Sequence, residues 1–474
     1  MSKPAMPRPP DQVTLEQLKQ ITGPAGWSDD PDTLAPHLVE WRSRYQGKTP
    51  LLLKPATTAE VAAIVRVCAQ HEVGIVPQGG NTGLVGAQIP RASGQEVLVS
   101  LSRMNRVRVV DPINNTLTAE AGCLLAAVQQ AAAEADRLFP LSLAAEGSCQ
   151  IGGNLSTNAG GIHVLRYGNS RDLVLGLEVV TAQGEIWDGL RGLRKDNTGY
   201  DLKQLYIGAE GTLGIITAAV LKLFPRHRQV ETAFAAVPTP EAVLDLLTLA
   251  REVSGDGGVL AFEMISRFAL DLVLKHVAGS LDPLATRSPW YVLVDLTVAR
   301  TTAEAFMTQA LDYGLISDAA LAGSAAQAAA LWKLRESISE AQKREGGSIK
   351  NDVSVPVSHI PSFIKQALAA VAELVPGIRP VPFGHVGDGN LHFNFSQPAD
   401  MDQDAYLARW DEVSRVVHAI VVAHGGSISA EHGIGVAKRE EARRYKSAVE
   451  LDLMGRIKQA LDPKGIMNPG KGIV

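Results

Sequence analysis

Residues 147–161, which read Gly-Ser-Cys-Gln-Ile-Gly-Gly-Asn-Leu-Ser-Thr-Asn-Ala-Gly-Gly, constrain the fold of this chain more than any other stretch. Five of these fifteen residues are glycine, which disfavours the interior of a helix or a strand. Glycine also lets backbone N–H groups come close to phosphate oxygens, and short polar side chains add hydrogen-bond donors without bulk. We therefore expect an irregular loop that lies against a ligand, with an ordinary long surface loop as the alternative.

The same chemistry occurs twice more before residue 220. Residues 77–90 read Pro-Gln-Gly-Gly-Asn-Thr-Gly-Leu-Val-Gly-Ala-Gln-Ile-Pro, and residues 208–216 read Gly-Ala-Glu-Gly-Thr-Leu-Gly-Ile-Ile. The chain has no Gly-x-Gly-x-x-Gly motif, and its one near-match to a Walker A loop, at 465–472, lacks the required Ser or Thr. Three glycine-rich stretches therefore predict one large, phosphate-bearing ligand that is held outside the usual dinucleotide-binding fold.

The length of 474 residues exceeds what one hydrophobic core usually holds, so we expect at least two domains. Hydrophobic residues make up 46% of the chain and charged residues 20%, which is typical of a soluble globular protein. The net charge of −5 gives no electrostatic case for binding nucleic acid or an anionic membrane. Residues 1–10 lack the apolar core of a signal peptide, and no apolar run is long enough to span a membrane, so we expect a cytoplasmic protein.

The three cysteines, Cys68, Cys123 and Cys149, are too few and too scattered for a disulfide framework or a thiolate metal site. We expect all three to be small buried residues.

Hydrophobic periodicity divides the chain into two regions. Between residues 51 and 224 short apolar strands alternate with helices, which predicts a mixed α/β domain. Beyond residue 225, strand–helix pairs predict a second, α+β domain with a largely antiparallel sheet. In the first region we expect helices at 58–71 and 124–135, strands at 74–77, 96–101, 107–110 and 117–121, and a hairpin of 174–181 with 184–187. In the second we expect strands at 230–236, 258–264, 290–298 and 348–355. We also expect one helix that begins after the N-cap residue Thr239, and further helices at 266–276, 302–314, 319–331, 332–343 and 401–424.

Residues 383–395, Phe-Gly-His-Val-Gly-Asp-Gly-Asn-Leu-His-Phe-Asn-Phe, carry the most specific chemistry. Asp388-Gly389 predicts a two-residue hairpin turn, which would place His385 directly opposite His392 with Cβ atoms roughly 4.5–5.5 Å apart. Two imidazoles at that spacing can share a divalent metal ion, and Asn394 would lie on the same face. A pair of hydrogen-bonded structural histidines is the alternative.

Glu431 and His432 are the best candidates for completing such a site. They follow the predicted end of the helix 401–424 and so lie on irregular backbone, where functional groups are common. Two histidines and a carboxylate suit Zn²⁺ or another first-row divalent ion, and leave open positions for substrate oxygens.

Two cations could bind carboxylates. Arg335 lies one turn from Ser339 in the predicted helix 332–343, and Lys350 lies in the predicted strand 348–355. Both side chains can clamp a carboxylate. From the residues alone, a solvated surface charge is the default interpretation of each.

Taken together, the three glycine-rich stretches, the segment His385–His392 and the segment Glu431-His432-Gly433-Ile434-Gly435 resemble FAD-linked oxidoreductases with the vanillyl-alcohol oxidase / p-cresol methylhydroxylase fold. Within that fold they are most similar to the D-2-hydroxyglutarate / D-lactate dehydrogenase branch. The resemblance implies an α+β (mixed α/β) protein with a two-part FAD-binding domain at 1–228 and a substrate-binding cap domain at 229–430. The C-terminal segment 431–474 would carry metal and base residues and return to the FAD-binding domain.

The resemblance also implies roles for single residues. FAD would be non-covalent, because 77–86 offers no histidine or similar nucleophile. His385, His392 and Glu431 would bind Zn²⁺ or Mn²⁺, and His432 would be the catalytic base. The substrate would contact Arg335, Lys350, Asn394 and Ser339, which stands where a threonine is more usual. FAD would contact Pro77, Gly79, Gly80, Asn81, Thr82, Gly83, Leu84, Gly147, Ser148, Gly152, Gly153, Asn154, Ser156, Thr157, Gly160, Gly161, Glu210, Gly214, Ile216 and Asn468.

By the same resemblance the chain would oxidise a D-2-hydroxy acid to its 2-oxo acid. Because Arg335 and Lys350 add to the charge of a metal ion, a dicarboxylate such as D-2-hydroxyglutarate or D-malate is favoured over D-lactate. Reoxidation of the flavin then requires an electron acceptor, either an electron-transfer flavoprotein or a quinone-linked one. A D-lactate dehydrogenase, a glycolate-type oxidase of the same fold and a non-enzymatic flavin or metal protein are the alternatives, and a homodimer is left open.

Overall fold

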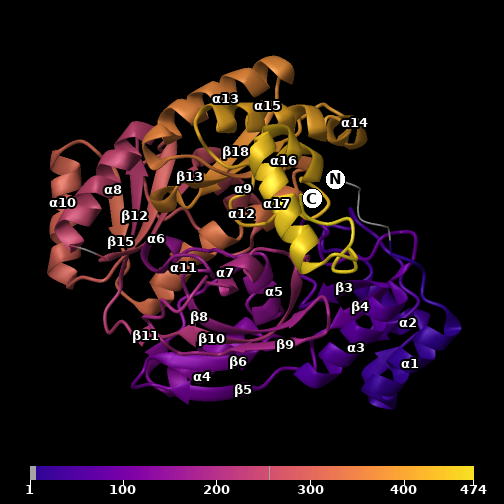
Figure 1. Ribbon diagram of the computed structural model, residues 1–474. Helices are drawn as coiled ribbons and strands as arrows, with labels where there is room; N and C mark the ends of the chain where they lie inside the picture. The colour runs from indigo at the N-terminus through magenta and orange to yellow at the C-terminus, as the bar shows by residue number, and fades with distance from the viewer. Residues whose placement is uncertain (1–6, 256, 474) are drawn as a thin grey trace. The chain divides into compact units, whose positions relative to one another are not determined.

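The computed structural model describes residues 7–255 and 257–473 (Figure 1). They form two compact units. Unit 1 comprises the residues up to Gly160, Gly168–Arg226 and the residues from Glu431 on; unit 2 comprises Gly161–Tyr167 and His227–Ala430. Residues 1–6, part of the N-terminal stretch searched for a signal peptide, lie outside the described residues. Within the described part, no helix combines the length and the apolar character needed to cross a membrane.

One sheet of unit 1 has four strands in the order β1-β2-β4-β3. The predicted strands β3 (Gly74–Gln78) and β4 (Glu96–Ser100) are confirmed, and they run parallel to each other. All of β4 is buried, as expected of a parallel strand that is covered on both faces. The predicted helix α3 (Thr58–His71) packs its apolar residues into the same core, and the Thr57 side chain caps it by accepting the N–H of Glu60. The other elements here are α1 (Gln12–Thr22), β1 (Trp27–Ser28), α2 (Pro31–Leu34) and β2 (Leu52–Leu53).

The second sheet of unit 1 has five antiparallel strands in the order β5-β6-β10-β8-β9. β8 (Val174–Thr181) and β9 (Ile186–Gly189) form the predicted hairpin. Cys68, Cys123 and Cys149 are buried and free, as expected. The remaining elements of unit 1 are β5 (Val107–Asp111), β6 (Thr116–Glu120), α4 (Leu125–Glu134), β7 (Arg137–Leu138), α5 (Ile151–Ser156), α7 (Lys203–Tyr206), β10 (Gly214–Lys222), β11 (Phe224–Pro225), α16 (Arg439–Tyr445) and α17 (Ala448–Leu461).

Unit 2 is built on an eight-stranded sheet in the order β15-β12-β14-β13-β18-β19-β16, with β17 also paired to β19. Its pairings are antiparallel, which confirms the α+β prediction. The strands are β12 (Glu231–Val237), β13 (Val259–Ser266), β14 (Trp290–Leu296), β15 (Asp318–Leu321), β16 (Ser348–Ile349), β17 (Asp352–Ser354), β18 (Arg379–Gly384) and β19 (Asn390–Ser396).

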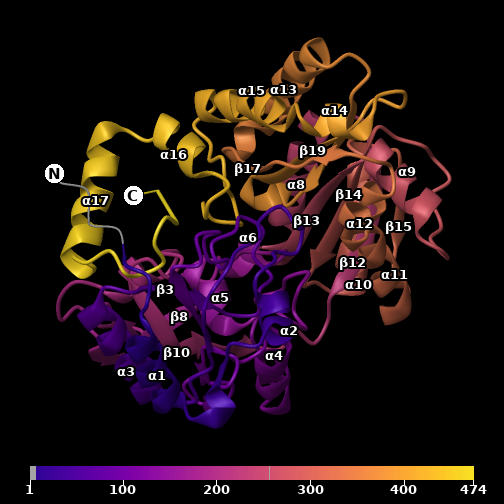
Figure 2. The ribbon, with the colours of Figure 1, turned by 90° about the vertical axis from the view of Figure 1, so that its right-hand side faces the viewer.

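Helices pack on both faces of this sheet. One core joins it to α8 (Pro240–Ser254), α10 (Arg300–Asp312), α13 (Ile360–Leu374) and α15 (Trp410–Ala423). The opposite face packs against α9 (Arg267–His276), α11 (Ala325–Glu336) and α12 (Ile338–Lys343). α13 and α15 lie side by side in both views (Figures 1 and 2). Two further α-helices of unit 2 are α6 (Val164–Tyr167) and α14 (Gln403–Leu407).

Four predicted elements of unit 2 differ from the structure. The predicted helix 319–331 is wrong at its start, because Ala319 and Ala320 pair with β12 as the edge strand β15, and Ser324 then caps α11. The predicted helix 332–343 breaks at Ser337 between α11 and α12. The predicted strand 348–355 is interrupted between β16 and β17, and the predicted helix 401–424 is divided into α14 and α15.

Candidate active site

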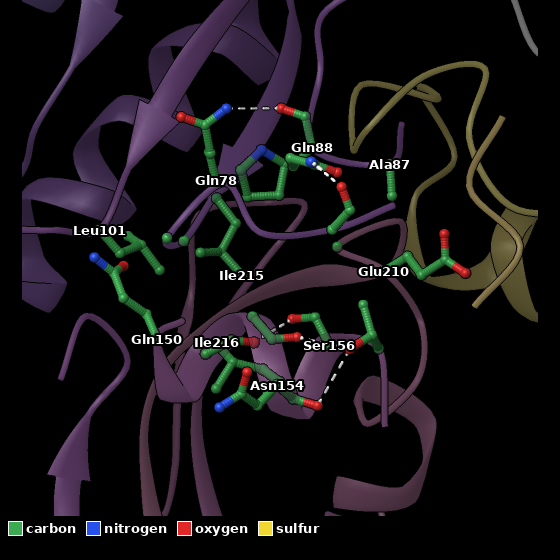
Figure 3. Close-up of a pocket in the computed structure, with 18 of the residues that line it drawn as sticks. Gln78, Ala87, Gln88, Leu101, Gln150, Asn154, Ser156, Glu210, Ile215 and Ile216 are labelled. Atoms are coloured by element: carbon green, nitrogen blue, oxygen red, sulfur yellow. Dashed lines mark hydrogen bonds between the residues drawn. The ribbon is translucent and has the colours of Figure 1, made fainter. Parts of the chain in front are cut away.

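The three glycine-rich stretches meet in unit 1 and line one pocket of about 780 Å³, its open mouth included (Figure 3). Glycine is what allows the stretches to meet. A Cβ atom on Gly80 would lie 2.0 Å from the backbone oxygen of Ser148, and a Cβ on Gly211 would lie 2.4 Å from Cγ of Pro77. The backbone of each stretch therefore fills the space that side chains would occupy elsewhere.

Part of the stretch 147–161 is helical, so the expectation of an irregular loop is wrong there. α5 contains Gly152 and Gly153, which cost about 1 kcal/mol each relative to alanine in a helix. Tertiary packing overrides this propensity, because Ile151 and Leu155 are buried and a Cβ on Gly152 would lie 2.7 Å from Cβ of Ala121. Gly153 meets nothing within 4 Å on its Cβ side and lines the pocket, which leaves room for a ligand.

Most residues predicted to contact FAD line this pocket, whereas Leu84, Gly147, Ser148, Gly160 and Gly161 do not. Leu101 also lines it and carried no sequence signal. Six other lining residues fall inside the glycine-rich stretches and could have been included by taking each stretch whole: Gln78, Ala87, Gln88, Gln150, Gly211 and Ile215. The predicted residues in the lining are Pro77, Gly79, Gly80, Asn81, Thr82, Gly83, Gly152, Gly153, Asn154, Ser156, Thr157, Glu210, Gly214, Ile216 and Asn468.

Two features of the pocket wall fit FAD. The buried amide oxygens Gln150 Oε1 and Asn468 Oδ1 have no hydrogen-bond partner among the described residues. A buried polar atom without a partner costs about 1–3 kcal/mol, so a ligand that offers N–H or O–H donors, as the rings and ribityl chain of FAD do, suits the pocket. In addition, Asn81, Glu210 and Asn468 adopt the left-handed backbone conformation, a strain that clusters at ligand sites.

The C-terminal segment of unit 1 is attached to the wall of this pocket. The Glu210 carboxylate accepts the N–H of Ile434 at 2.6 Å and that of Gly435 at 2.7 Å. Gly433 lies so close that a Cβ on it would be 2.6 Å from Glu210 Oε1. Burial raises the pKa of Glu210, although the two N–H groups oppose this effect. His432, the predicted base, therefore directly precedes Gly433, which lies against Glu210 in the wall of the pocket.

The chain bends at residues 430–432. A carboxylate oxygen of Glu431 and a ring nitrogen of His432 lie within 4.8 Å of each other. The two adjacent side chains can therefore approach one ion together.

In unit 2, β18 and β19 form the predicted hairpin, but the two-residue turn at Asp388-Gly389 is wrong. Phe383, not His385, lies opposite His392. The turn is wider because Val386–Asp388 form a short 3-10 helix, and the backbone oxygen of His385 accepts the N–H groups of both Asp388 and Asn390.

His385 and His392 are nevertheless neighbours. Their ring centroids are 5.5 Å apart with the rings at 74°, and one ring nitrogen of each lies within 4.8 Å of the other. Two imidazole nitrogens at this spacing can bind one divalent ion.

Behind His385 lies Glu263 of β13, a fully buried carboxylate that the sequence analysis missed. Its Oε1 lies 2.5 Å from His385 Nδ1, and its Oε2 accepts the Nε–H of Arg335 at 2.5 Å. Burial acts to raise the pKa of Glu263, but Arg335 and His385 outweigh it and hold the pKa at about 2. The carboxylate is therefore charged. No sequence motif around residue 263 predicts its role.

The predicted substrate-binding residues also lie in unit 2. Arg335 is buried, and its guanidinium lies 4.8 Å from the Phe383 ring centroid. Lys350 Nζ donates to the backbone oxygen of Ser339 at 3.2 Å, which brings the residue that follows β16 next to a residue of α12. The Asn394 amide accepts the N–H of Asn351 and donates to Gln342, each at 3.2 Å.

Comparison with known families supports this reading of the two units. Residues 49–189 match the family described as FAD binding domain, and residues 226–472 match FAD linked oxidases, C-terminal domain. A mitochondrial D-2-hydroxyglutarate dehydrogenase from Danio rerio is 40% identical, with 98% of this chain and 87% of the relative covered. The mitochondrial enzyme of that name from Arabidopsis thaliana is 38% identical, with 97% and 81% covered. A D-2-hydroxyglutarate dehydrogenase from Xanthomonas citri pv. viticola is 39% identical, with 96% and 95% covered.

Solved structures with low sequence identity share the fold. p-Cresol methylhydroxylase with substrate bound superposes with a TM-score of 0.77 at 15% identity, covering 99% of each chain. Alkyldihydroxyacetonephosphate synthase gives a TM-score of 0.73 at 18% identity, covering 98% of this chain and 87% of the other. The chain is thus an FAD-linked oxidoreductase of this fold, and it belongs to the family of the D-2-hydroxyglutarate dehydrogenases.

Proposed function

We propose that this protein uses FAD and a divalent metal ion to oxidise a D-2-hydroxy acid to its 2-oxo acid, with D-2-hydroxyglutarate or D-malate as the favoured substrate. One observation carries the proposal. In unit 2 a buried carboxylate, Glu263, joins a histidine of a two-histidine pair to a buried arginine. A group suited to bind a metal ion and a group suited to bind a carboxylate are therefore neighbours. A hydroxy acid, which carries both a hydroxyl and a carboxylate, would use both.

The pocket of unit 1 would hold the FAD. Its wall of backbone, its orphaned amide oxygens on Gln150 and Asn468, and the family of residues 49–189 all support this assignment. FAD, when bound, supplies the acceptor for the hydride that leaves C2 of the substrate.

The metal ion would be held by His385, His392 and Glu431. The first two are neighbours in unit 2, and the third is attached close by through the chain itself. The backbone N–H of Ala430 donates to the oxygen of Asp352, which lies directly opposite His392 on the sheet. Glu431 is the next residue, one Cα step of about 3.8 Å further. Zn²⁺ or Mn²⁺, when bound, would lower the pKa of the substrate hydroxyl.

Arg335 and Lys350 would bind carboxylates of the substrate. Only the Nε of Arg335 has a hydrogen-bond partner among the described residues, so its two terminal amino groups can bind a carboxylate in a fork. Asn394 still has one N–H and one lone pair to offer after its bonds to Asn351 and Gln342. Two cations in addition to a metal ion exceed the needs of one carboxylate, which favours a dicarboxylate.

His432 would take the proton of the substrate hydroxyl as hydride leaves C2. Its position supports this role, because Gly433 and Ile434 attach it to Glu210 in the wall of the FAD pocket. A neutral imidazole near neutral pH is suited to accept the proton. The electrons would then pass to an electron-transfer flavoprotein or a quinone-linked acceptor.

A D-lactate dehydrogenase or a glycolate-type oxidase of the same fold is the second candidate. Titration of the anaerobic protein with D- and L-2-hydroxy acids separates these functions. We expect the flavin absorbance to bleach with D-2-hydroxyglutarate or D-malate, less readily with D-lactate, and not with the L-enantiomers. Bleaching by glycolate with rapid peroxide formation in air would favour an oxidase, and no bleaching with any 2-hydroxy acid would contradict the proposal.

A further inference from the structure

We infer that Glu263 is a positioning residue, which uses one buried carboxylate to orient both the metal-binding His385 and the substrate-binding Arg335. This inference rests on the proposed function, but the roles that it adds belong to Glu263 alone. The residue contacts neither substrate nor flavin in the proposal. It acts through its two partners.

The sheet of unit 2 places Glu263 beside His385. β13 and β18 pair in the register Met264 with Gly384 and Ile265 with Phe383. Glu263 and His385 each come one residue past the Met264–Gly384 pair, and there Oε1 of Glu263 lies within hydrogen-bonding distance of Nδ1 of His385. The side chain of Glu263 is fully buried, so its two oxygens have fixed partners and no competing water.

The contact with His385 determines which ring nitrogen can bind a metal. A carboxylate is only an acceptor, so the Nδ1 that lies 2.5 Å from Glu263 Oε1 must carry the proton. The tautomer with Nδ1–H has its lone pair on Nε2. Glu263 therefore presents Nε2 as the metal ligand and fixes the plane of the ring, as carboxylates behind metal-binding histidines do.

The contact with Arg335 leaves its carboxylate-binding end available. Glu263 Oε2 takes the Nε–H, which is the donor on the side of the guanidinium nearest the backbone. The ring of Phe383, which lies in β18 two residues before His385, is 4.8 Å from the centre of the guanidinium. With one edge held by Glu263 and one face against Phe383, the terminal amino groups of Arg335 have a fixed direction.

A glutamine at this position cannot serve both partners. If its amide oxygen accepts from Arg335, its amide nitrogen faces His385 and favours the tautomer with the proton on Nε2, which blocks metal binding there. If the amide is flipped, its N–H₂ group faces the Nε–H of Arg335, donor against donor. Glu263→Gln can therefore present an acceptor oxygen to only one of the two partners, whereas the carboxylate presents one to each.

Glu345 provides a matched control in the same unit. It is also a largely buried glutamate with ion-pair partners, Lys275, His276 and Arg379, but it contacts none of the residues in the proposed site. Glu345→Gln has the same change in charge and shape. It reports what the loss of a buried carboxylate does to unit 2 in general.

The decisive measurement is the Zn²⁺ affinity of metal-free protein with FAD bound, determined by competition with a zinc-binding dye. We expect Glu263→Gln to bind Zn²⁺ about 10–100-fold more weakly than wild type, the usual effect of losing the partner of a metal-binding histidine. At saturating Zn²⁺ it should still show a raised KM for D-2-hydroxyglutarate, because a neutral amide holds the guanidinium of Arg335 less firmly than a carboxylate does. Glu345→Gln should match wild type in both, and FAD content should be unchanged in all three proteins.

Wild-type-like Zn²⁺ affinity and KM in Glu263→Gln would overturn the inference while leaving the proposed metal site intact. A wild-type protein that does not compete with the dye for Zn²⁺ would overturn both. If Glu263→Gln does not fold, Glu263→Asp keeps the charge on a side chain one methylene shorter, which cannot reach both partners. A folded Asp variant with unchanged Zn²⁺ affinity and unchanged KM would also overturn the inference.

Discussion

The pocket of unit 1 and the polar site of unit 2 are built in opposite ways. The first is mostly backbone: three glycine-rich stretches come so close that a Cβ at Gly80 would collide with Ser148. The second consists of charged and polar side chains at one end of the β18–β19 hairpin and on α11, where the buried carboxylate of Glu263 links His385 to Arg335. The first site therefore depends on close packing of the main chain, and the second on the charge and tautomer of a few side chains.

If that contrast holds, adding a single methyl group should destroy the first site. Gly80→Ala would place a Cβ 2.0 Å from the backbone oxygen of Ser148, a clash that no rotamer relieves. We expect loss of bound FAD and of all turnover, measured by the flavin spectrum after purification. Gly147→Ala is the control, because its Cβ meets nothing within 4 Å and the residue does not line the pocket. Retention of FAD by Gly80→Ala would show that the contact between the two stretches is not required.

The next largest effect should come from the proposed base. His432→Ala should keep FAD and metal but lose about 10²–10⁴-fold in kcat, the usual contribution of a positioned acid–base group. In the wild type, kcat should fall at acidic pH because a protonated imidazole cannot accept a proton, and this fall should be absent from the variant. A variant that is purified without metal, and regains activity with excess metal, would make His432 a ligand instead.

The second site should discriminate between substrates through charge. Lys350→Met should reduce kcat/KM for the dicarboxylate by roughly 1.5–3 kcal/mol, the range for hydrogen bonds to charged groups, and reduce it less for D-lactate. Lys365→Met, which removes an exposed lysine of α13, should change neither value. Equal losses on both substrates would exclude Lys350 from binding the distal carboxylate.

The smallest effect concerns stability rather than catalysis. Burial acts to raise the pKa of Glu345, but Lys275, His276 and Arg379 outweigh it and hold the pKa at about 2. Because this pKa lies below the unfolded value, the stabilisation is fully present above about pH 4.5 and is lost as the pH falls toward 2. Glu345→Gln should therefore lower the free energy of unfolding by about 1–2 kcal/mol at pH 7. A loss that persists unchanged near pH 2.5, measured by thermal melts, would contradict this assignment.

The two regions also differ in how far the sequence could predict them. Glycine content reports directly on backbone that lies against a ligand, so the first site could be found from the stretches themselves. Even there α5 was missed, because packing of Ile151 and Leu155 overrides the low helix propensity of Gly152 and Gly153.

The second site depends on residues that only the sheet brings together. The hairpin motif predicted the neighbourhood of His385 and His392, although the turn is wider than the two residues that Asp388-Gly389 suggested. Glu263 is about 120 residues away in sequence from His385 and is surrounded by ordinary strand residues. Its role comes from the β13–β18 register, which no local pattern encodes.

The central claim, that flavin binding and metal binding are separate properties of two differently built sites that act together, is tested most directly by removing the metal. Purified protein would be treated with a chelator, and its FAD content, metal content and turnover of D-2-hydroxyglutarate measured on the same sample. We predict that FAD remains bound while turnover is abolished, and that Zn²⁺ or Mn²⁺ restores it. Full turnover by protein that is free of metal and still holds FAD would contradict the claim.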